Sequence, residues 1–427
     1  MFHNFERVRR TFRGVAVATF VTVYSSAICF GQAPYTIGVT ADITGGAKSP
    51  NNVGGSSPSQ NSGEIDPFVG TYPSISFKAK GEHSSLESRY GFGYDRNFTD
   101  PRSENKSHAA TVGYSAGFGP NWKFNLSDSF SMTSDISSYN LLSGSGAASA
   151  QSGQNVQNPQ GAQSAQPDQF QFAFTPVFAQ SNRNNTASVS LDRTLNPKSA
   201  LSFSSTYSTL VYPSSTFQSA GVVSDQQRLG AGVRYTHSGQ RSSWSIGYTG
   251  SAIRFATYED SDNHSVLVGY THRFSPALSI QLDAGPSYVS SSEDLDSTLG
   301  ANVTVAVIRV IAKGSFNFRV SQRSGDTSGL GSVSTFQEVG LKYTRTFGKS
   351  TTISADVSGF NSEELKVDPL SSRGYAAGGN IAFSMGRNWS MNFGGQFQHY
   401  EGSDTFPYDQ KRIFASLRYS NPELWRF

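Results

Sequence analysis

The chain has 427 residues, of which 15% are charged, 36% hydrophobic and 13% aromatic, and it contains 42 glycines. A soluble domain of this size usually carries about 25% charged residues, and a disordered chain lacks this many aromatic side chains. No run of about 20 apolar residues follows the N-terminal region, which excludes a helical membrane protein. An all-β protein remains, and its commonest example with this composition is a membrane β-barrel.

The first 33 residues have the layout of a secretory signal peptide. Four arginines within residues 1–13 precede an apolar stretch over residues 14–30, and Gly31-Gln32-Ala33 supplies small residues at a cleavage site. We therefore predict a signal peptide over residues 1–33, with a short membrane anchor as the alternative. Cys29 is the only cysteine of the chain, so the exported protein has no disulfide and no thiol chemistry.

Removal of this leader leaves 30 basic and 30 acidic residues. This even balance provides no basic excess for a nucleic-acid partner, and none is predicted.

From residue 34 onward, apolar and polar residues alternate with a period of two. Residues 86–94, 108–118 and 122–132 are clear examples, and alternation over about 8–12 residues predicts strands with one apolar face. The predicted strands begin near Tyr35, Tyr72, Leu86, His108, Trp122, Ala187, Leu201, Arg228, Ser243, His264, Leu278, Leu299, Lys313, Val333, Thr351, Gly374, Trp389 and Gln410. A count of 18 results. A count of 16 stays open, because the first strand and the turn within residues 303–316 are weakly marked.

Short and long connections alternate along these strands. The short ones contain Gly, Pro or Asn, as tight turns require. The long ones are polar, and the longest are predicted over residues 43–70 and 133–185, where phenylalanines in 170–178 allow a further strand or a plug instead. This layout predicts an antiparallel up-and-down transmembrane β-barrel of 16–18 strands over residues 34–427, with short turns at one end and long loops at the other.

Tryptophans follow the same pattern. Trp122, Trp244 and Trp389 each begin a strand directly after a short turn, and Trp425 is near the C-terminus. Because amphipathic rings favour the membrane–water interface, these residues predict an interfacial girdle at the periplasmic end.

Charged residues occupy the phase opposite to the apolar one, where a barrel directs them into its lumen, because charge on the lipid face costs about 2–4 kcal/mol at the midplane. Two interpretations stand: a wall that sets ion or solute preference, or pairs of mixed sign that stiffen the wall. The predicted lumen-facing residues are Glu87, Arg89, Asp95, Lys123, Asp192, Arg228, Arg234, Asp283, Glu338, Lys342, Arg412 and Arg418.

Catalytic and ligand motifs are not recognisable. The seven histidines are scattered without metal-ligand spacing, and His264 and His399, each near a predicted loop, are the only positions that even mildly suggest catalysis. No nucleophile, acid and base constellation and no phosphate-binding loop occurs. We therefore predict no metal, no cofactor and no enzymatic activity.

The segments 88–98 and 113–130 carry aromatic-Gly alternation, a Gly-Pro-Asn turn and a re-entering aromatic strand. In these features the chain resembles Gram-negative outer-membrane β-barrel proteins, in particular the porin-like barrels of the β-barrel porin 2 type. The resemblance implies an outer-membrane location and passive or export-linked passage of small hydrophilic solutes. The final Phe427 matches the terminal residue that the barrel-assembly machinery reads in such proteins, whereas Pro422 predicts that the last strand ends before it.

Three functional hypotheses follow, and the third, an outer-membrane enzyme, lacks a recognisable catalytic constellation. The first is a porin-like barrel whose partners are outer-membrane lipid, the assembly machinery and small polar solutes. The second is a non-conducting surface barrel that acts in adhesion or partner binding through its long loops. The oligomeric state stays open.

Overall fold

The computed structural model describes residues 34–48, 66–98, 104–133, 182–212, 225–256, 260–291, 297–326, 333–364, 371–402 and 405–426. Within these ranges the chain forms strands joined by turns, and none of it is helical. No helix in the described part of the chain is long and apolar enough to cross a membrane. The predicted signal peptide lies outside the described residues.

The strands are β1 (Tyr35–Lys48), β2 (Asp66–Thr71), β3 (Ser74–Lys80), β4 (Ser84–Asn97), β5 (Glu104–Phe118), β6 (Trp122–Thr133), β7 (Asn182–Asn196), β8 (Ser199–Val211), β9 (Gln226–Ser238), β10 (Ser242–Phe255), β11 (Ser261–Ser275), β12 (Leu278–Ser291), β13 (Thr298–Ile311), β14 (Gly314–Asp326), β15 (Val333–Phe347), β16 (Thr351–Glu364), β17 (Ser371–Ser384), β18 (Trp389–Gly402) and β19 (Thr405–Arg426).

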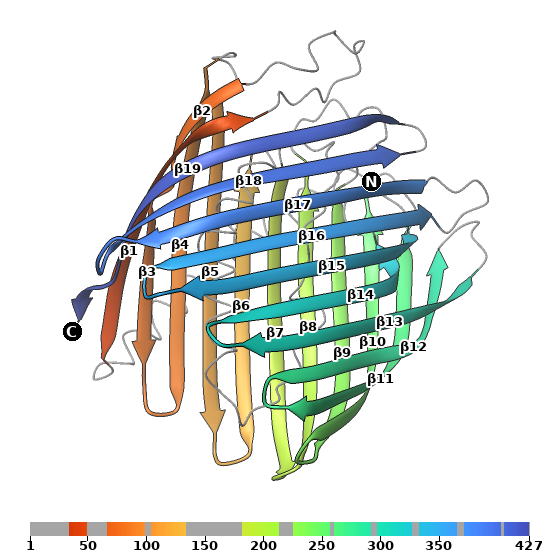
Figure 1. Ribbon diagram of the computed structural model, residues 1–427. Coiled ribbons are helices and arrows are strands. Elements are labelled where there is room, and N and C mark those ends of the chain that lie inside the picture. Colours follow the sequence, from red (N-terminus) through yellow and green to blue (C-terminus); the bar gives the residue numbers. More distant parts are fainter. Residues whose placement is uncertain are drawn as a thin grey trace, which may run out of the picture.

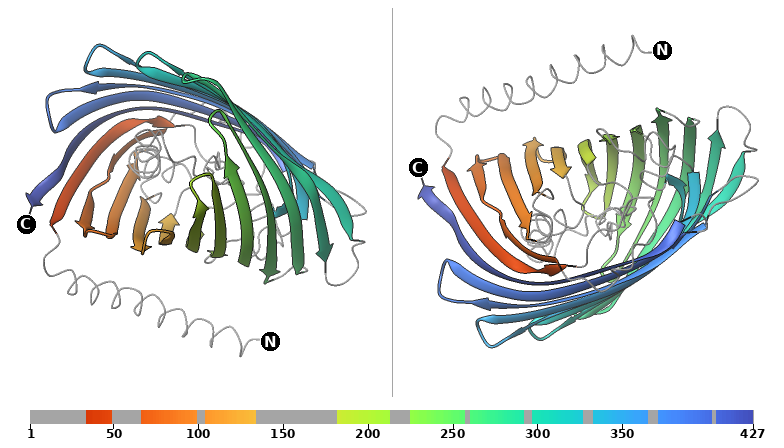
Figure 2. Two further views of the ribbon diagram at one scale, coloured as in Figure 1. Left: turned by 90° about the horizontal axis from the view of Figure 1, so that it is seen from below. Right: turned by 90° about the horizontal axis from the view of Figure 1, so that it is seen from above.

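Antiparallel pairing joins these strands into one closed wall (Figures 1 and 2). The last strand returns to the first, with Leu417 of β19 opposite Ile43 of β1. β2 and β3 both pair with β1 on one side and with β4 on the other, so they are two halves of a single strand. The barrel therefore has 18 strands, which confirms the predicted fold class and selects 18 over 16.

The break between β2 and β3 has a local cause. Pro73 has no N–H to donate to a neighbouring strand, so the regular ladder is interrupted there. The pairing nevertheless continues through the break, because Tyr72 N donates to Asp42 O at 2.8 Å and Phe92 N donates to Pro73 O at 3.0 Å. The strand start predicted near Tyr72 was wrong, since the strand begins at Asp66.

The long loops are shorter than predicted. Strand structure extends to Lys48 and resumes at Asp66, so both ends of the predicted loop 43–70 are strand. Similarly, β7 begins at Asn182 within the predicted loop 133–185. The remaining residues of both segments, including the four phenylalanines, lie outside the described residues. Strands of this barrel run beyond their apolar segments, which is why alternation alone underestimated their length.

The two ends of the barrel differ. Short turns connect β3–β4, β5–β6, β7–β8, β9–β10, β11–β12, β13–β14, β15–β16 and β17–β18, all at the end that also holds both strand termini, Tyr35 and Arg426 (Figure 1). The turn left open within residues 303–316 is formed by two residues between Ile311 and Gly314. One of them, Lys313, adopts a φ of 64°, a left-handed conformation that favours glycine.

Replacing Lys313 with glycine is expected to stabilise the barrel by about 1 kcal/mol, because a residue with a Cβ is strained in the left-handed region. The change is measured as the free energy of unfolding in urea. Lys349, which lies in another short turn, is the matched control. Its replacement by glycine removes a lysine without relieving such strain, so equal gains in both variants would contradict this explanation.

The C-terminal strand does not end at Pro422 as predicted. β19 continues to Arg426, and its register with β1 shifts between Val39↔Asn421 and Ile37↔Trp425, which defines a bulge. Gly38 lies opposite this bulge, and a Cβ there would lie 2.9 Å from the Pro422 Cα. The bulge therefore accommodates Pro422 at the point where the facing strand has Gly38, which has no side chain.

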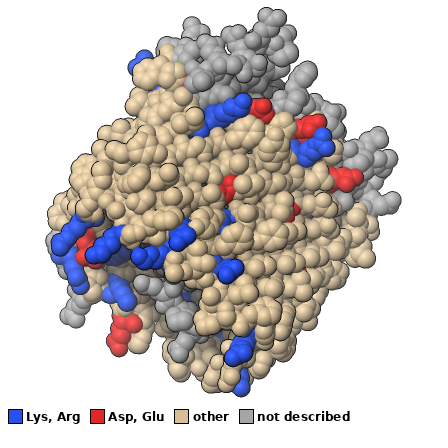
Figure 3. Space-filling model, in the orientation of Figure 1, with Lys and Arg blue, Asp and Glu red and all other residues tan. Residues whose placement is uncertain are grey.

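Large apolar side chains lie exposed on one face of the wall, and small polar ones lie buried on the other. On β11, Val266, Val268 and Tyr270 are exposed by 42%, 54% and 47%, whereas Ser265 on the opposite face is 7% exposed. Figure 3 shows an extended surface with few charges over the strands, and Lys and Arg gather mainly toward its margins. The outer face of the barrel is thus apolar, and the inner face is polar.

Candidate functional site: the polar inner wall

All the predicted lumen-facing residues lie on the face opposite to the exposed apolar side chains. Of these, Asp95, Asp283, Glu338 and Arg412 are buried. The set is distributed over Glu87, Arg89 and Asp95 on β4, Lys123 on β6, Asp192 on β7, Arg228 and Arg234 on β9, Asp283 on β12, Glu338 and Lys342 on β15, and Arg412 and Arg418 on β19.

An ion pair spans four strands of this wall. Arg234 Nη2 of β9 donates to Asp283 Oδ1 of β12 at 2.7 Å, and Asp283 is only 6% exposed at its side chain. Arg234 Nε also donates to Ser245 Oγ at 3.1 Å, and Gln281 Nε2 donates to Asp283 Oδ2 at 2.7 Å. This brace fixes the relative register of β9, β10 and β12 on the inner face.

Glycines make room for the brace. Gly247 of β10 pairs with Arg234, and Gly269 of β11 pairs with Asp283. A Cβ at Gly269 would lie 2.5 Å from Asp283 Oδ1 and 2.9 Å from Arg234 Nη2. The arginine side chain therefore crosses two strands along a path that these glycines leave open.

A second ion pair closes the barrel seam between β1 and β19. Arg418 Nε donates to Asp42 Oδ2 at 3.2 Å, and Asp42 also accepts a hydrogen bond from Thr44 Oγ1 at 3.1 Å. Arg89 of β4 is close enough to Arg418 for electrostatic repulsion, and its Nη2 donates to Ser74 Oγ at 3.1 Å. The seam thus combines a buried pair with an additional cation.

Tyr72 links β1, at the seam, to β4. Its hydroxyl donates to the Asp95 carboxylate, and its ring packs over Gly93, where a Cβ would lie 2.8 Å from the ring. Arg412 of β19 stacks over the Phe68 ring at 4.4 Å from its centroid. The sequence analysis did not predict Asp42 and Tyr72 as inner-wall residues. Asp42 alternates in phase with Thr40 and Thr44 on β1, whereas Tyr72 lies beside Pro73 between β2 and β3.

Replacing Tyr72 with phenylalanine is expected to lower the free energy of unfolding by about 2 kcal/mol, because the buried Asp95 loses a hydroxyl donor. Chemical unfolding in urea measures this change. Tyr207→Phe serves as the control, since the Tyr207 hydroxyl donates to Gln227 Oε1 over 3.5 Å and its loss is expected to cost less. Equal losses in the two variants would refute a special role for the Asp95 contact.

Glu338 is the centre of a third group. It accepts a hydrogen bond from Ser321 Oγ at 3.4 Å, and Arg323 Nη2 lies 3.8 Å from its Oε2. Arg319, a buried residue of β14, also interacts with it electrostatically. Sequence reasoning did not single out Arg319, because the strand boundaries near residue 316 were unresolved there.

Several of the other predicted residues also lie beside polar or oppositely charged side chains. Glu87 pairs with Lys78 at 2.8 Å, but both side chains are substantially exposed. Lys123 faces Asp192 across the β6–β7 ladder, and Asp192 accepts hydrogen bonds from Asn125 and Ser202. Lys342 faces Asp356 in the same way. The inner wall therefore holds charges of both signs, most of them beside an opposite charge.

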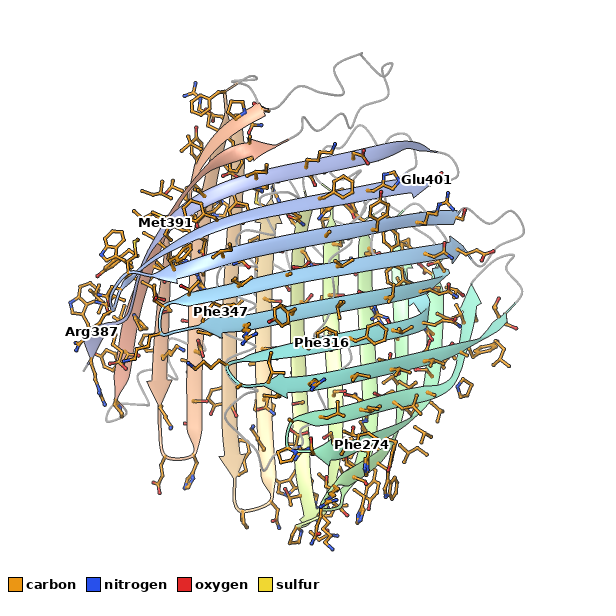
Figure 4. The ribbon with its side chains drawn as sticks, viewed as in Figure 1. Phe274, Phe316, Phe347, Arg387, Met391 and Glu401 are labelled. Atoms are coloured by element: carbon orange, nitrogen blue, oxygen red, sulfur yellow. The ribbon has the colours of Figure 1, made fainter. Side chains whose placement is uncertain are left out.

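The four tryptophans lie at one end of the barrel. Trp122, Trp244 and Trp389 follow the β5–β6, β9–β10 and β17–β18 turns, and Trp425 is near the end of β19. Trp244 lies 5.3 Å from the Tyr235 ring, and Trp389 lies 5.1 Å from the Tyr419 ring, between centroids. This placement is the one that a girdle at a single interface requires. Figure 4 shows Arg387, in the turn before Trp389, at the opposite end of the sheet from Glu401.

The histidines within the described strands lie on the outer face. His108 contacts the Tyr90 hydroxyl at 2.8 Å, and His264 contacts that of Tyr248 at 2.7 Å. His399, which sequence reasoning also noted, lies 2.6 Å from Asp409. No group of three or more His, Cys, Asp or Glu within the described ranges could hold a metal ion.

No protein-family model matches the chain, and no curated protein matches it. Among solved structures it is similar to Acinetobacter baumannii OccAB4, with 8% identity and a TM-score of 0.46 over 91% of this chain and 98% of that chain. It is also similar to Pseudomonas aeruginosa OccK2 (OpdF), with 7% identity and a TM-score of 0.47 over 90% and 98%. Pseudomonas aeruginosa OpdQ gives 8% identity and a TM-score of 0.45 over 92% and 99%.

The strand pairing and the two faces decide the architecture on their own. Eighteen antiparallel strands close on themselves, apolar side chains cover the outside, and the turns are short at one end only. The fold is that of a closed antiparallel β-barrel of 18 strands with an apolar outer face and a polar inner face.

Proposed function

We propose that the protein is an outer-membrane channel that allows small hydrophilic solutes to pass, by passive diffusion or linked to an export system. The observation that carries this proposal is the inner face of the closed 18-stranded wall, which is polar and charged while the outer face is apolar. Barrels of about 16–18 strands usually enclose an aqueous lumen. The even number of strands brings both strand termini to the end with short turns, as outer-membrane insertion requires.

The charges of the inner wall support a role in solute passage. They include cations on β4, β9, β15 and β19 and anions on β1, β4, β12 and β15. Water-filled channels use such side chains to favour or disfavour ions. We propose that these residues set the solute preference, and that the buried pairs among them also hold the wall in shape.

Planar-bilayer recording of the refolded full chain tests the channel proposal. A conducting channel is expected to give steady single-channel steps on the order of nanosiemens, as a water-filled lumen of this size class allows. The control is the same preparation kept unfolded, which gives no steps. A barrel that is folded, as shown by heat-modifiable migration in a gel, but never conducts would overturn the channel in favour of a surface barrel that binds partners through its loops.

A further inference from the structure

Among the carboxylates of the described strands, one lies near the middle of the apolar outer face. Asp128 of β6 is in the same phase as Trp122, Leu126 and Phe130, and it pairs with Val112 on one side and Ala187 on the other. It is six residues beyond Trp122 and five before Thr133. With a rise of about 3.3 Å per residue and a tilt of about 40°, Asp128 lies roughly 15 Å along the barrel axis from Trp122.

In the outer-membrane setting of the proposed function, this depth is near the centre of an apolar band about 25 Å tall. Acyl chains offer no hydrogen-bond donor there, and lipid headgroups and sugars are too far away to reach the carboxylate. Other outward-facing carboxylates of the described strands, such as Asp262, Glu363 and Asp409, lie toward the strand ends at the long loops. The position of Asp128 therefore requires another explanation than contact with the headgroup region.

A polar side chain on the neighbouring strand satisfies part of the hydrogen-bonding capacity of Asp128. Asn185 Nδ2 of β7 donates to Asp128 Oδ1 at 3.0 Å, and Asn185 is on the same outer face. An amide carries two N–H donors and a carboxylate carries two acceptor oxygens. One donor and one oxygen are used in this bond, so a second N–H of Asn185 and Oδ2 of Asp128 remain for a further partner.

We infer that this face of β6 and β7 is the contact between two copies of the chain, related by a two-fold axis. The pair is self-complementary, since the second N–H of Asn185 in each copy can donate to Asp128 of the other. A two-fold interface places the same patch on both partners and requires this kind of reciprocity. The residues beside the pair, Val112 and Ala187, are small enough for two barrel walls to approach closely.

Single cysteines test this contact, because the only natural cysteine, Cys29, lies in the predicted leader. We expect Ala187→Cys, next to Asp128, to form a disulfide-linked dimer in native outer membranes after mild oxidation. Ala355→Cys on β16 is the matched control, since it is an outward alanine halfway around the strand order and is expected to stay monomeric. No cross-link at residue 187, or a cross-linked product whose mass is not twice that of the chain, would overturn the two-fold dimer.

Asp128→Leu tests the chemistry of the contact. In detergent, light scattering is expected to give the mass of a dimer for the unmodified protein and of a monomer for the variant, while Asp128→Asn keeps a hydrogen-bonding group and retains most of the dimer. A monomeric unmodified protein, or a dimer unaffected by Asp128→Leu, would refute the inference. Conductance of the variants separates the two proposals, because single channels are expected to persist in the monomer.

Discussion

Replacing Arg234 with methionine is expected to lower the free energy of unfolding by about 3 kcal/mol, the largest effect on stability among the changes considered. The substitution keeps the apolar length of the side chain but leaves the buried Asp283 carboxylate without its cation. Removing one partner of a buried ion pair leaves an uncompensated charge, which costs more than the pair itself contributes. Tryptophan fluorescence during urea unfolding in lipid vesicles measures the change.

An exposed pair provides the comparison. Lys78→Met removes a cation from Glu87, but both side chains of that pair are largely in solvent, so a loss below about 1 kcal/mol is expected. The double variant Arg234→Met with Asp283→Leu is expected to recover most of the stability, because it removes both charges together. Equal losses for Arg234→Met and Lys78→Met would show that the brace does not stabilise the wall.

Replacing Arg89 with glutamate is expected to have the largest effect on conduction, raising the ratio of cation to anion permeability by roughly threefold at low salt. Arg89 is on the inner face near Arg418, and the Asp42 carboxylate already pairs with Arg418. Reversing the charge at residue 89 therefore changes the net charge of this part of the inner wall by two elementary charges. The reversal potential across a bilayer with a salt gradient measures the change.

Arg387→Glu is the matched control for this selectivity experiment. Arg387 lies in the turn between β17 and β18, at the end of the barrel and away from the inner wall (Figure 4). The same charge reversal there is expected to leave the reversal potential close to that of the unmodified channel. Equal shifts in both variants, or none in Arg89→Glu, would contradict a role for the inner wall in selectivity.

The seam illustrates why some functional residues were predictable and others were not. Arg418 and Arg89 were found because each is a charged residue in a strongly alternating strand. Asp42 was missed because its strand is weakly marked, and Tyr72 was missed because Pro73 interrupts the pattern beside it. A residue's phase can be read along one strand, but its partner depends on the strand beside it.

Alternation with a period of two was enough to predict the fold class, the 18-strand alternative, the two faces and the grouping of the tryptophans at one end. This local pattern is reliable because successive side chains of a strand always point to opposite faces. The sequence by itself therefore determined which residues lie on the apolar outer face and which lie on the polar inner face, without any knowledge of which strands meet.

Tertiary structure alone decided which side chains meet across the wall. Arg234 and Asp283 are 49 residues apart, and Arg418 and Asp42 are 376 apart, so both contacts depend on the register of several paired strands. It also decided that β19 continues through Pro422, because Gly38 on the facing strand leaves space for the bulge. Alternation contains no information about register between strands, and register is set only when the barrel closes.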